Sequence, residues 1–494
     1  MMRCISGCLV ALTVNFGASA QQVNAPLAEL GLQSRIEALS SQSDAHGFEL
    51  GMLITLRGIE KTLQTRYEFG LGGPMRELPI LRLELGPRNP QPKQAQPDTL
   101  TKMMLTALTD LQNARAVLKD AADAGRVMPF DLTVQDVLFD VNSNGSREAN
   151  EGVVDALGPL LLGRRAMQQV EATGALEGPI TVRFDEADHA WLTAYTHMLS
   201  GMGNLFVAFD PAPIIENLAN RRERLSQVPI VPNTYDKDAL MLEIAALNAE
   251  KRRVDRSVTR QNERLQQLRA REQALRAATP QDDAEIRALT AERAKIETEV
   301  VVPLRQEQRF LQAEISAANA KLNNPKRGFE DKWVQQADSF YVLLSALRQQ
   351  PKAERVTAAR DHWRAMLVEN RLFWALLQEE QDNDREWIPN PSQGSALGIA
   401  VNQQTADAWQ AILDDAEALL DGRLLLPHPL LPEGVGISLK AYAENPGPLD
   451  LLDWVHGIGA YEYAAKGPMI SRQRWLAFNR LTGGNAGGFA LFFN

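Results

Sequence analysis

Hydrophobic residues recur every three or four positions along several long stretches of the chain, which is the spacing of amphipathic helices. One early stretch begins at Asp98 or Thr99, either of which can cap it, and ends near Ala124. By contrast, Ile80–Leu85 reads as a short strand. The pattern therefore predicts a mainly α fold with minor β content, whose other helices outside 236–323 lie at 27–70, 329–349, 352–380 and 404–421.

The longest pattern begins at residue 237. Its apolar residues occupy the a and d positions of one heptad frame: Ile244, Leu247, Val254, Val258, Leu265, Leu268 and Leu275. Lys251, Gln261 and Glu272 are the polar exceptions in that frame. Thr279-Pro280 then interrupts the helix. Two helical arms of similar length joined by a tight turn predict a long antiparallel coiled-coil hairpin over 236–323.

The second arm of this hairpin contains a change of phase. Its seam resumes at Ile286, Leu289, Ile296 and Val300. After Pro303 the seam continues at Leu304, Leu311, Ile315 and Leu322. Proline removes a backbone hydrogen bond within a helix, so we expect a kink at Pro303.

The hairpin separates two other regions, an N-terminal helical region at 21–235 and a C-terminal helical region at 324–494. Seven of the eight tryptophans lie in the C-terminal region. Large aromatic rings on helices are expected to fill a core, although a flat platform for sugars or peptides is the alternative.

The first twenty residues have the features of a secretory signal. Arg3 precedes an apolar run over 5–16, and Ala18-Ser19-Ala20 is a small-x-small cleavage pattern. We therefore expect a signal peptide at 1–20, a mature chain from Gln21, and a periplasmic or secreted product. A lipoprotein box ending at Cys8 is the alternative, but the apolar run follows that cysteine instead of preceding it.

Composition narrows the function classes further. Both cysteines, Cys4 and Cys8, lie in the expected signal, so the mature chain has no disulfides or thiolate chemistry. The 52 Lys and Arg against 62 Asp and Glu argue against a nucleic-acid surface. No later apolar run reaches the ~18 residues that a membrane span needs.

The sharpest chemical signal lies between Asp140 and Glu151. Calcium requires six to eight oxygen ligands, and the segment places oxygen-bearing residues at alternating positions around Gly145, which permits a sharp turn. The segment resembles the twelve-residue loop of the EF-hand, and the resemblance is confined to this part of the chain. The resemblance implies calcium as the cofactor, with ligands Asp140, Asn142, Asn144, Ser146 (through its carbonyl), Glu148 and Glu151.

Two departures from the paired EF-hand pattern limit this resemblance. Arg147 stands where paired loops have an aliphatic residue, and the sequence has no second loop. Asn142 and Asn144 replace carboxylates, which implies a modest affinity in the range of ~10⁻⁴–10⁻³ M. We therefore expect a solitary, structural calcium site. The alternative is an Asn/Gly surface turn followed by the acidic first turn of a helix.

Asp185 and His189 form a second candidate constellation, at i,i+4 on an expected helix, with Asp188 between them. With His197 they offer transition-metal or acid/base chemistry. The simpler interpretation is that Asp185 caps the helix and Asp188 stabilises its first turn. His362 and His456 are interpreted as ordinary packed or surface histidines.

Together these patterns favour an exported calcium-binding protein that acts as a structural scaffold or interaction protein, with a protein partner along the 237–322 hairpin. The alternative is an exported hydrolase or metal-dependent enzyme using groups around Asp185, His189 and Asp210. A third interpretation is that the hairpin completes the protein's own core. No nucleophile or phosphate-loop motif is present, so the sequence argues for binding over catalysis.

Overall fold

The computed structural model describes residues 26–41, 46–71, 89–147, 151–154, 178–226, 237–277, 283–323, 331–381, 385–397, 401–484, 486–487 and 490. The chain divides into two compact units. Unit 1 comprises residues 1–220 and 339–494, and unit 2 comprises 221–338. The fold is mainly α, as predicted. The expected signal peptide and the expected strand at 80–85 lie outside the described residues.

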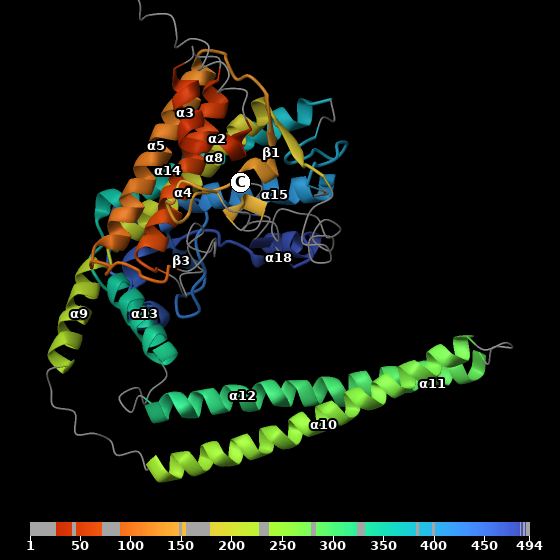
Figure 1. The fold of residues 1–494 in the computed structure, drawn as a ribbon. Helices are drawn as coiled ribbons and strands as arrows, with labels where there is room; N and C mark the ends of the chain where they lie inside the picture. The colour runs from red at the N-terminus through yellow and green to blue at the C-terminus, as the bar shows by residue number, and fades with distance from the viewer. Residues whose placement is uncertain are drawn as a thin grey trace, which may run out of the picture. The chain divides into compact units, whose positions relative to one another are not determined.

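Unit 1 is built around four long helices that pack along one another (Figure 1). Of these, α8 packs along α14, α4 along α5, and α5 along α8. Their bounds are α4 Gly47–Glu68, α5 Thr99–Asp123, α8 Glu186–Ala208 and α14 Ala353–Glu379. The other helices with residues in this unit are α2 Leu27–Leu30, α3 Leu32–Ser40, α9 Ala212–Ser226, α13 Asp331–Leu347, α15 Gln403–Leu420, α16 Leu439–Glu444, α17 Leu451–His456 and α18 Arg472–Leu481.

The capping prediction for α5 is only partly right. Asp98 occupies the N-cap position, but its side chain makes no capping hydrogen bond. It instead pairs with Lys102, one turn along, at 2.7 Å.

Two small antiparallel sheets supply the β content. Strand β1 (Phe130–Thr133) pairs with β2 (Thr181–Phe184), with Phe130 opposite Phe184. Strand β3 (Val435–Ile437) pairs with β4 (Ala464–Lys466). Single turns of 3₁₀-helix, η3 (Val134–Asp136) and η6 (Tyr461–Tyr463), follow β1 and precede β4. Strands of three or four residues are too short to show a clear alternation in the sequence.

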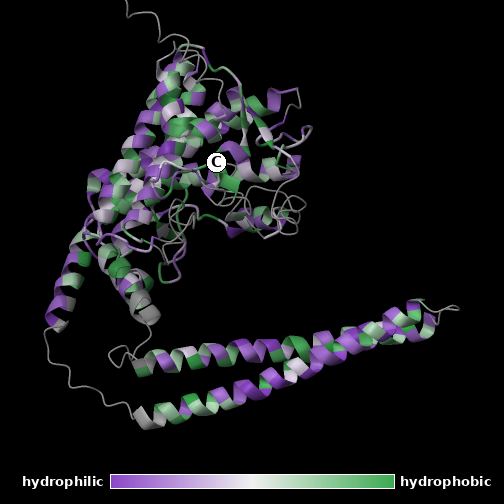
Figure 2. Cartoon of the chain, viewed as in Figure 1, coloured by the Kyte–Doolittle hydropathy of each residue, from purple (hydrophilic) through white to green (hydrophobic). Residues whose placement is uncertain are grey.

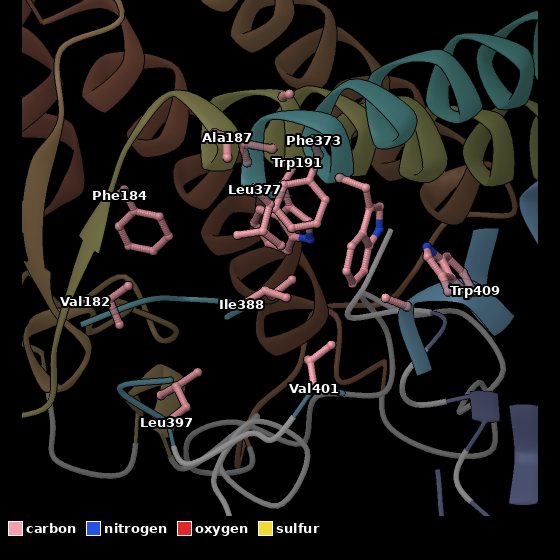
Figure 3. Close-up of a cluster of buried hydrophobic side chains, with 14 of the residues drawn as sticks. Val182, Phe184, Ala187, Trp191, Phe373, Leu377, Ile388, Leu397, Val401 and Trp409 are labelled. Carbon is pink, nitrogen blue, oxygen red and sulfur yellow. The ribbon is translucent and has the colours of Figure 1, made fainter. Parts of the chain in front are cut away.

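Aromatic rings fill the main core of unit 1. Figure 3 shows Trp191 of α8 near Phe373 and Leu377 of α14, within one cluster of buried side chains. Trp374 and Trp409 are buried in the same cluster. Burying each such ring stabilises the fold by roughly 2–3 kcal/mol. This cluster therefore holds α8 and α14 against each other.

Unit 2 contains two helical segments that pack along each other. Helix α10 (Lys237–Ala277) contacts α11 (Asp283–Ile296) and α12 (Val302–Asn323). The arms are antiparallel, because Arg264 pairs with Glu292 at 2.8 Å and the later Arg271 pairs with the earlier Glu285. Figure 2 shows apolar positions recurring among hydrophilic ones along both arms.

Most predicted seam positions are buried or half-buried. Within the seam, the polar exception Glu272 is almost fully buried and accepts hydrogen bonds from Arg276 at 2.7 Å and Arg293 at 2.6 Å. Hydrogen bonding by Arg276 and the charge of Arg293 hold the pKa of this carboxyl below its ordinary value. The predicted exception is therefore accommodated by two arginines on the two arms.

The prediction for Val300 is wrong. Val300 is 36% exposed, whereas its neighbour Val301 is 1% exposed. The two valines lie in η5 (Glu297–Val301), a π-helical turn directly before α12. A proline at position 303 would clash with the carbonyl of residue 299 in a regular α-helix. The wider turn inserts one extra residue, so the seam moves from Val300 to Val301.

Within the described residues, no single helix has the length and apolar character to cross a membrane. Helix α8 and the start of α9 meet those criteria only as a pair bent by 45°.

The π-helical turn predicts different effects for two neighbouring valines. Val301→Ala should lower the local free energy of opening of the hairpin by about 2 kcal/mol, because it removes two buried carbons. Val300→Ala, the matched control, should change it by no more than about 0.5 kcal/mol. Hydrogen exchange of the segment 286–323 measures both effects. Equal effects of the two substitutions would contradict the assignment of Val301, and not Val300, as the buried residue.

Candidate metal centre

The two ends of the predicted calcium loop lie side by side. Leu138 and Gly152 form an antiparallel bridge. The Phe139 N–H donates to the Glu151 carbonyl at 3.0 Å, and the Val153 N–H donates to the Val137 carbonyl at 2.9 Å. This closure brings the first and last predicted ligands to the same end of the loop.

Within the loop, backbone amides fold around three of the predicted side-chain ligands. The carboxylate of Asp140 accepts hydrogen bonds from the N–H groups of Asn144 and Gly145, each at 3.0 Å. The Asn142 side-chain oxygen accepts from the Asn144 N–H at 3.0 Å, and the Asn144 side-chain oxygen from the Ser146 N–H at 2.7 Å. Gly145 has a φ of +80°, a conformation that favours glycine. Such side-chain to backbone bonds also occur in an Asn/Gly surface turn, so they agree with both interpretations of the sequence.

Glu151 supplies the most informative feature of the loop. Its side chain is 0% exposed, and one carboxylate oxygen accepts from the Val141 N–H at 3.2 Å. Val141 directly follows Asp140, so the last predicted ligand is hydrogen-bonded to the backbone at the start of the loop. Burying a carboxylate is costly unless donors or a cation compensate its charge. The oxygen-rich donor set therefore fits a hard dication. Glu148 lies outside the described residues.

Helix α4 holds the start of the loop. The Asp140 N–H donates to the Glu60 carboxylate at 2.7 Å, and the Gln64 side-chain amide donates to the Asp140 carbonyl at 2.8 Å. Arg57 pairs with Glu60 at 2.7 Å. Burial raises the pKa of Glu60, and its hydrogen bonds with Asp140 and Arg57 act in the opposite direction.

Arg147 connects the loop to α2. Its guanidinium donates to the carbonyls of Ala28 at 2.9 Å and Glu29 at 2.7 Å. A side chain at Gly31, which has a φ of +80°, would collide with this guanidinium. The residue that departs from the paired EF-hand pattern thus contacts a helix of the same chain instead of a second loop.

A separate carboxylate cluster lies at the start of α8. The carboxylate oxygens of Asp185, Glu380 and Glu386 lie within 4.8 Å of one another. Asp185 caps α8 as predicted, accepting from the Ala187 N–H at 2.9 Å. Asp188 completes the capping box by accepting from the Asp185 N–H at 3.3 Å.

Asp188 lies beside these three carboxylates and is itself buried. Burial raises the pKa of Asp188 well above its ordinary value, and the charges of Asp185, Glu380 and Glu386 raise it further. Three oxygen donors at this spacing suit a hard dication, while the cap alone accounts for Asp185 and Asp188. Glu380 and Glu386 were not predicted as site residues, because only tertiary packing brings them beside Asp185.

The predicted set of Asp185, His189, His197 and Asp210 has no common centre. His189 Nε2 lies 3.0 Å from the Leu118 carbonyl. Asp210 accepts from the Thr101 hydroxyl at 2.6 Å and pairs with Lys352 at 3.1 Å. Each group therefore has its own structural partner in the described part of the chain.

His197 instead pairs with His362 of α14, which the sequence analysis interpreted as ordinary. Their Nδ1 atoms are 2.9 Å apart, so one ring donates and the other accepts. Arg115 lies close by and donates to the Ser200 hydroxyl at 2.7 Å. Burial, followed by the charges of Arg115 and His362, lowers the pKa of His197 to about 3. Burial also lowers the pKa of His362.

Comparisons with known proteins add no relative. The chain matches no protein-family model, and no match was found among the curated proteins or the solved structures.

The histidine pair predicts a loss of stability in mild acid. The pKa of His197 is about 3 in the folded chain against an ordinary value of 6.5, so only the unfolded chain gains this proton as the pH falls from 7 to 5. The free energy of unfolding should fall by about 1–2 kcal/mol over that interval from this group. In urea titrations at pH 7, 6 and 5, His197→Gln should show a shallower dependence on pH. The exposed control His456→Gln should keep the wild-type slope, and equal slopes for all three proteins would contradict the assignment.

Proposed function

We propose that this chain is an exported calcium-binding protein in which one EF-hand-type loop stabilises an α-helical scaffold. The ligands would be Asp140, Asn142, Asn144, the Ser146 carbonyl, Glu148 and Glu151. The observation that carries the proposal is the fully buried Glu151 carboxylate, which accepts a hydrogen bond from the backbone N–H of Val141 at the closed end of the loop. A bound dication would compensate the charges of Glu151 and Asp140.

The connections of the loop support a structural role for the cation. Arg147 joins the loop to α2, while Glu60 and Gln64 join it to α4. A ligand that binds the folded chain but not the unfolded chain stabilises the fold by mass action. Calcium would therefore stabilise the packing of α2 and α4 together with the loop.

The donor set also supports a modest affinity. Three of the six proposed ligands carry charge, Asp140, Glu148 and Glu151, and calcium affinity depends on ligand charge and site rigidity. An affinity of ~10⁻⁴–10⁻³ M suits a compartment with a steady calcium supply. Calcium at such a site would act as a permanent component of the fold and not as a signal.

In this scaffold role, the helical hairpin of unit 2 would be the surface that binds a protein partner. Its surface carries large apolar side chains, of which Leu242 is 72% exposed and Phe310 is 63% exposed. A partner that covered these side chains would remove their apolar surface from water. An enzymatic role around Asp185 and His189 is the weaker proposal, because these two side chains have separate partners in the described residues.

Calcium titration tests the proposal. Calorimetry of metal-free protein from Gln21 to Asn494 should show one saturable site, and calcium at about 100 times the Kd should add about 2.7 kcal/mol to the free energy of unfolding. Glu151→Gln should lose most of the heat and the rise in Tm, because a carboxylate ligand is removed from the loop. The exposed control Glu433→Gln should behave like the wild type. A titration without heat and without a change in Tm would contradict the calcium site.

A further inference from the structure

Two ion pairs define one flank of the hairpin in unit 2. Arg264 of α10 pairs with Glu292 of α11 at 2.8 Å, and Arg271 of α10 pairs with Glu285 of α11. In the heptad frame of the buried seam, each of these residues directly precedes an a position and is therefore a g residue. The g residues of both arms thus line the same flank of the hairpin.

Farther along this flank the two arms carry opposite charges. Helix α12 presents Glu307 and Glu314, g residues that directly precede the seam positions 308 and 315. We call these two residues the glutamate pair. Helix α10 presents Arg253 and Arg260, which occupy c positions, next to g on the helix surface. We call them the arginine pair. All four residues are exposed, and each pair has a spacing of seven residues.

These charges are not matched across the seam of the hairpin. Arg253 contacts Glu250, one turn away on its own helix, at 3.3 Å. Arg260 and the glutamate pair make no ion pair within the part of the chain that the structure describes. An extended polyanion, such as a nucleic acid or an anionic membrane, would meet the glutamate pair beside the arginine pair. A partner with both charges in the opposite order matches this flank better.

An exposed aromatic ring lies between the two glutamates. Phe310, a c residue of α12, is 63% exposed. Gln308 of α12 donates to the Asp255 carboxylate of α10 at 2.7 Å, which sets the relative level of the antiparallel arms. Arg253 is therefore at the level of Phe310, and the two glutamates lie roughly 5 and 6 Å from that level along the axis. The flank thus offers an aromatic anchor at the centre of its charged residues.

We propose that a second copy of this chain covers this flank, so that two hairpins pack as a four-helix bundle. A two-fold axis parallel to the hairpins places α10 of one copy against α12 of the other without a change of level. The arginine pair of one copy then faces the glutamate pair of the other, and symmetry repeats the contact. Phe310 packs against the stem and guanidinium of Arg253 from the other copy. This interface rests on the proposed role of the hairpin as a partner-binding surface, and it identifies the partner.

Reversal of the charges tests this interface. In sedimentation velocity of the protein from Gln21 to Asn494, at constant calcium and at concentrations up to about 100 µM, the wild type should show a monomer–dimer equilibrium. Glu307→Lys/Glu314→Lys places like charges at both symmetric contacts, and so does Arg253→Glu/Arg260→Glu. Each double variant should raise the dissociation constant of the dimer by about tenfold or more. All four positions are exposed, so both variants should keep the wild-type helix content.

An equal mixture of the two double variants provides the sharpest readout. Every contact in their heterodimer again joins a base to an acid, so the mixture should dimerise with the wild-type dissociation constant. Arg269→Glu/Arg305→Glu is the matched control for the arginine pair. It makes the same change of charge at exposed e positions, on the opposite flank, and should dimerise like the wild type. Phe310→Ala should weaken the dimer by about tenfold, because it removes the central anchor.

Three results would overturn the proposal. The first is a wild-type protein that stays monomeric over the whole concentration range. The second is a dimer that both charge reversals leave unchanged. The third is a mixture of the two double variants that stays monomeric. Because calcium is constant in these experiments, none of these results affects the calcium titration of Glu151→Gln, which tests the proposed calcium site separately.

Discussion

The buried carboxylate of Glu151 is the constraint on which this part of the fold depends. A negative charge with no exposed surface requires compensation, and the described loop offers it the Val141 N–H. The Val141 N–H that it accepts from directly follows Asp140, the first proposed ligand. In the proposed site a dication would compensate the charges of Glu151 and Asp140. It would then also stabilise α2 and α4, which contact the same loop.

Local signals in the sequence predicted the features that depend on neighbouring residues. The cap at Asp185 follows from spacing within one turn, and the long helix α10 follows from its apolar repeat. The calcium loop at 140–151 stays a prediction. Val300 shows the limit of such reasoning. The apolar positions predicted up to Ile296 are buried or half-buried, but a proline seven residues later is accommodated by a π-helical turn, which shifts the buried position by one residue.

Features that depend on distant parts of the chain were not predicted. Glu380 and Glu386 lie about 200 residues from Asp185, and His362 lies 165 residues from His197. No local pattern distinguishes these residues from ordinary surface groups. The Arg147 contact with α2 was likewise hidden, although the sequence marked Arg147 as unusual for a paired EF-hand. The contact with α2 explains why an arginine stands at position 147.

Hydrogen exchange with and without calcium would show whether a bound cation stabilises the loop and the helices that contact it. Calcium should slow exchange of the amides of Asn144, Gly145 and Ser146 and of the α2 and α4 segments by about tenfold or more. The helical arms at 237–277 and 283–323, which belong to unit 2, should exchange at unchanged rates. Unchanged exchange in the loop at saturating calcium would contradict the claim that a cation at Glu151 stabilises this part of the fold.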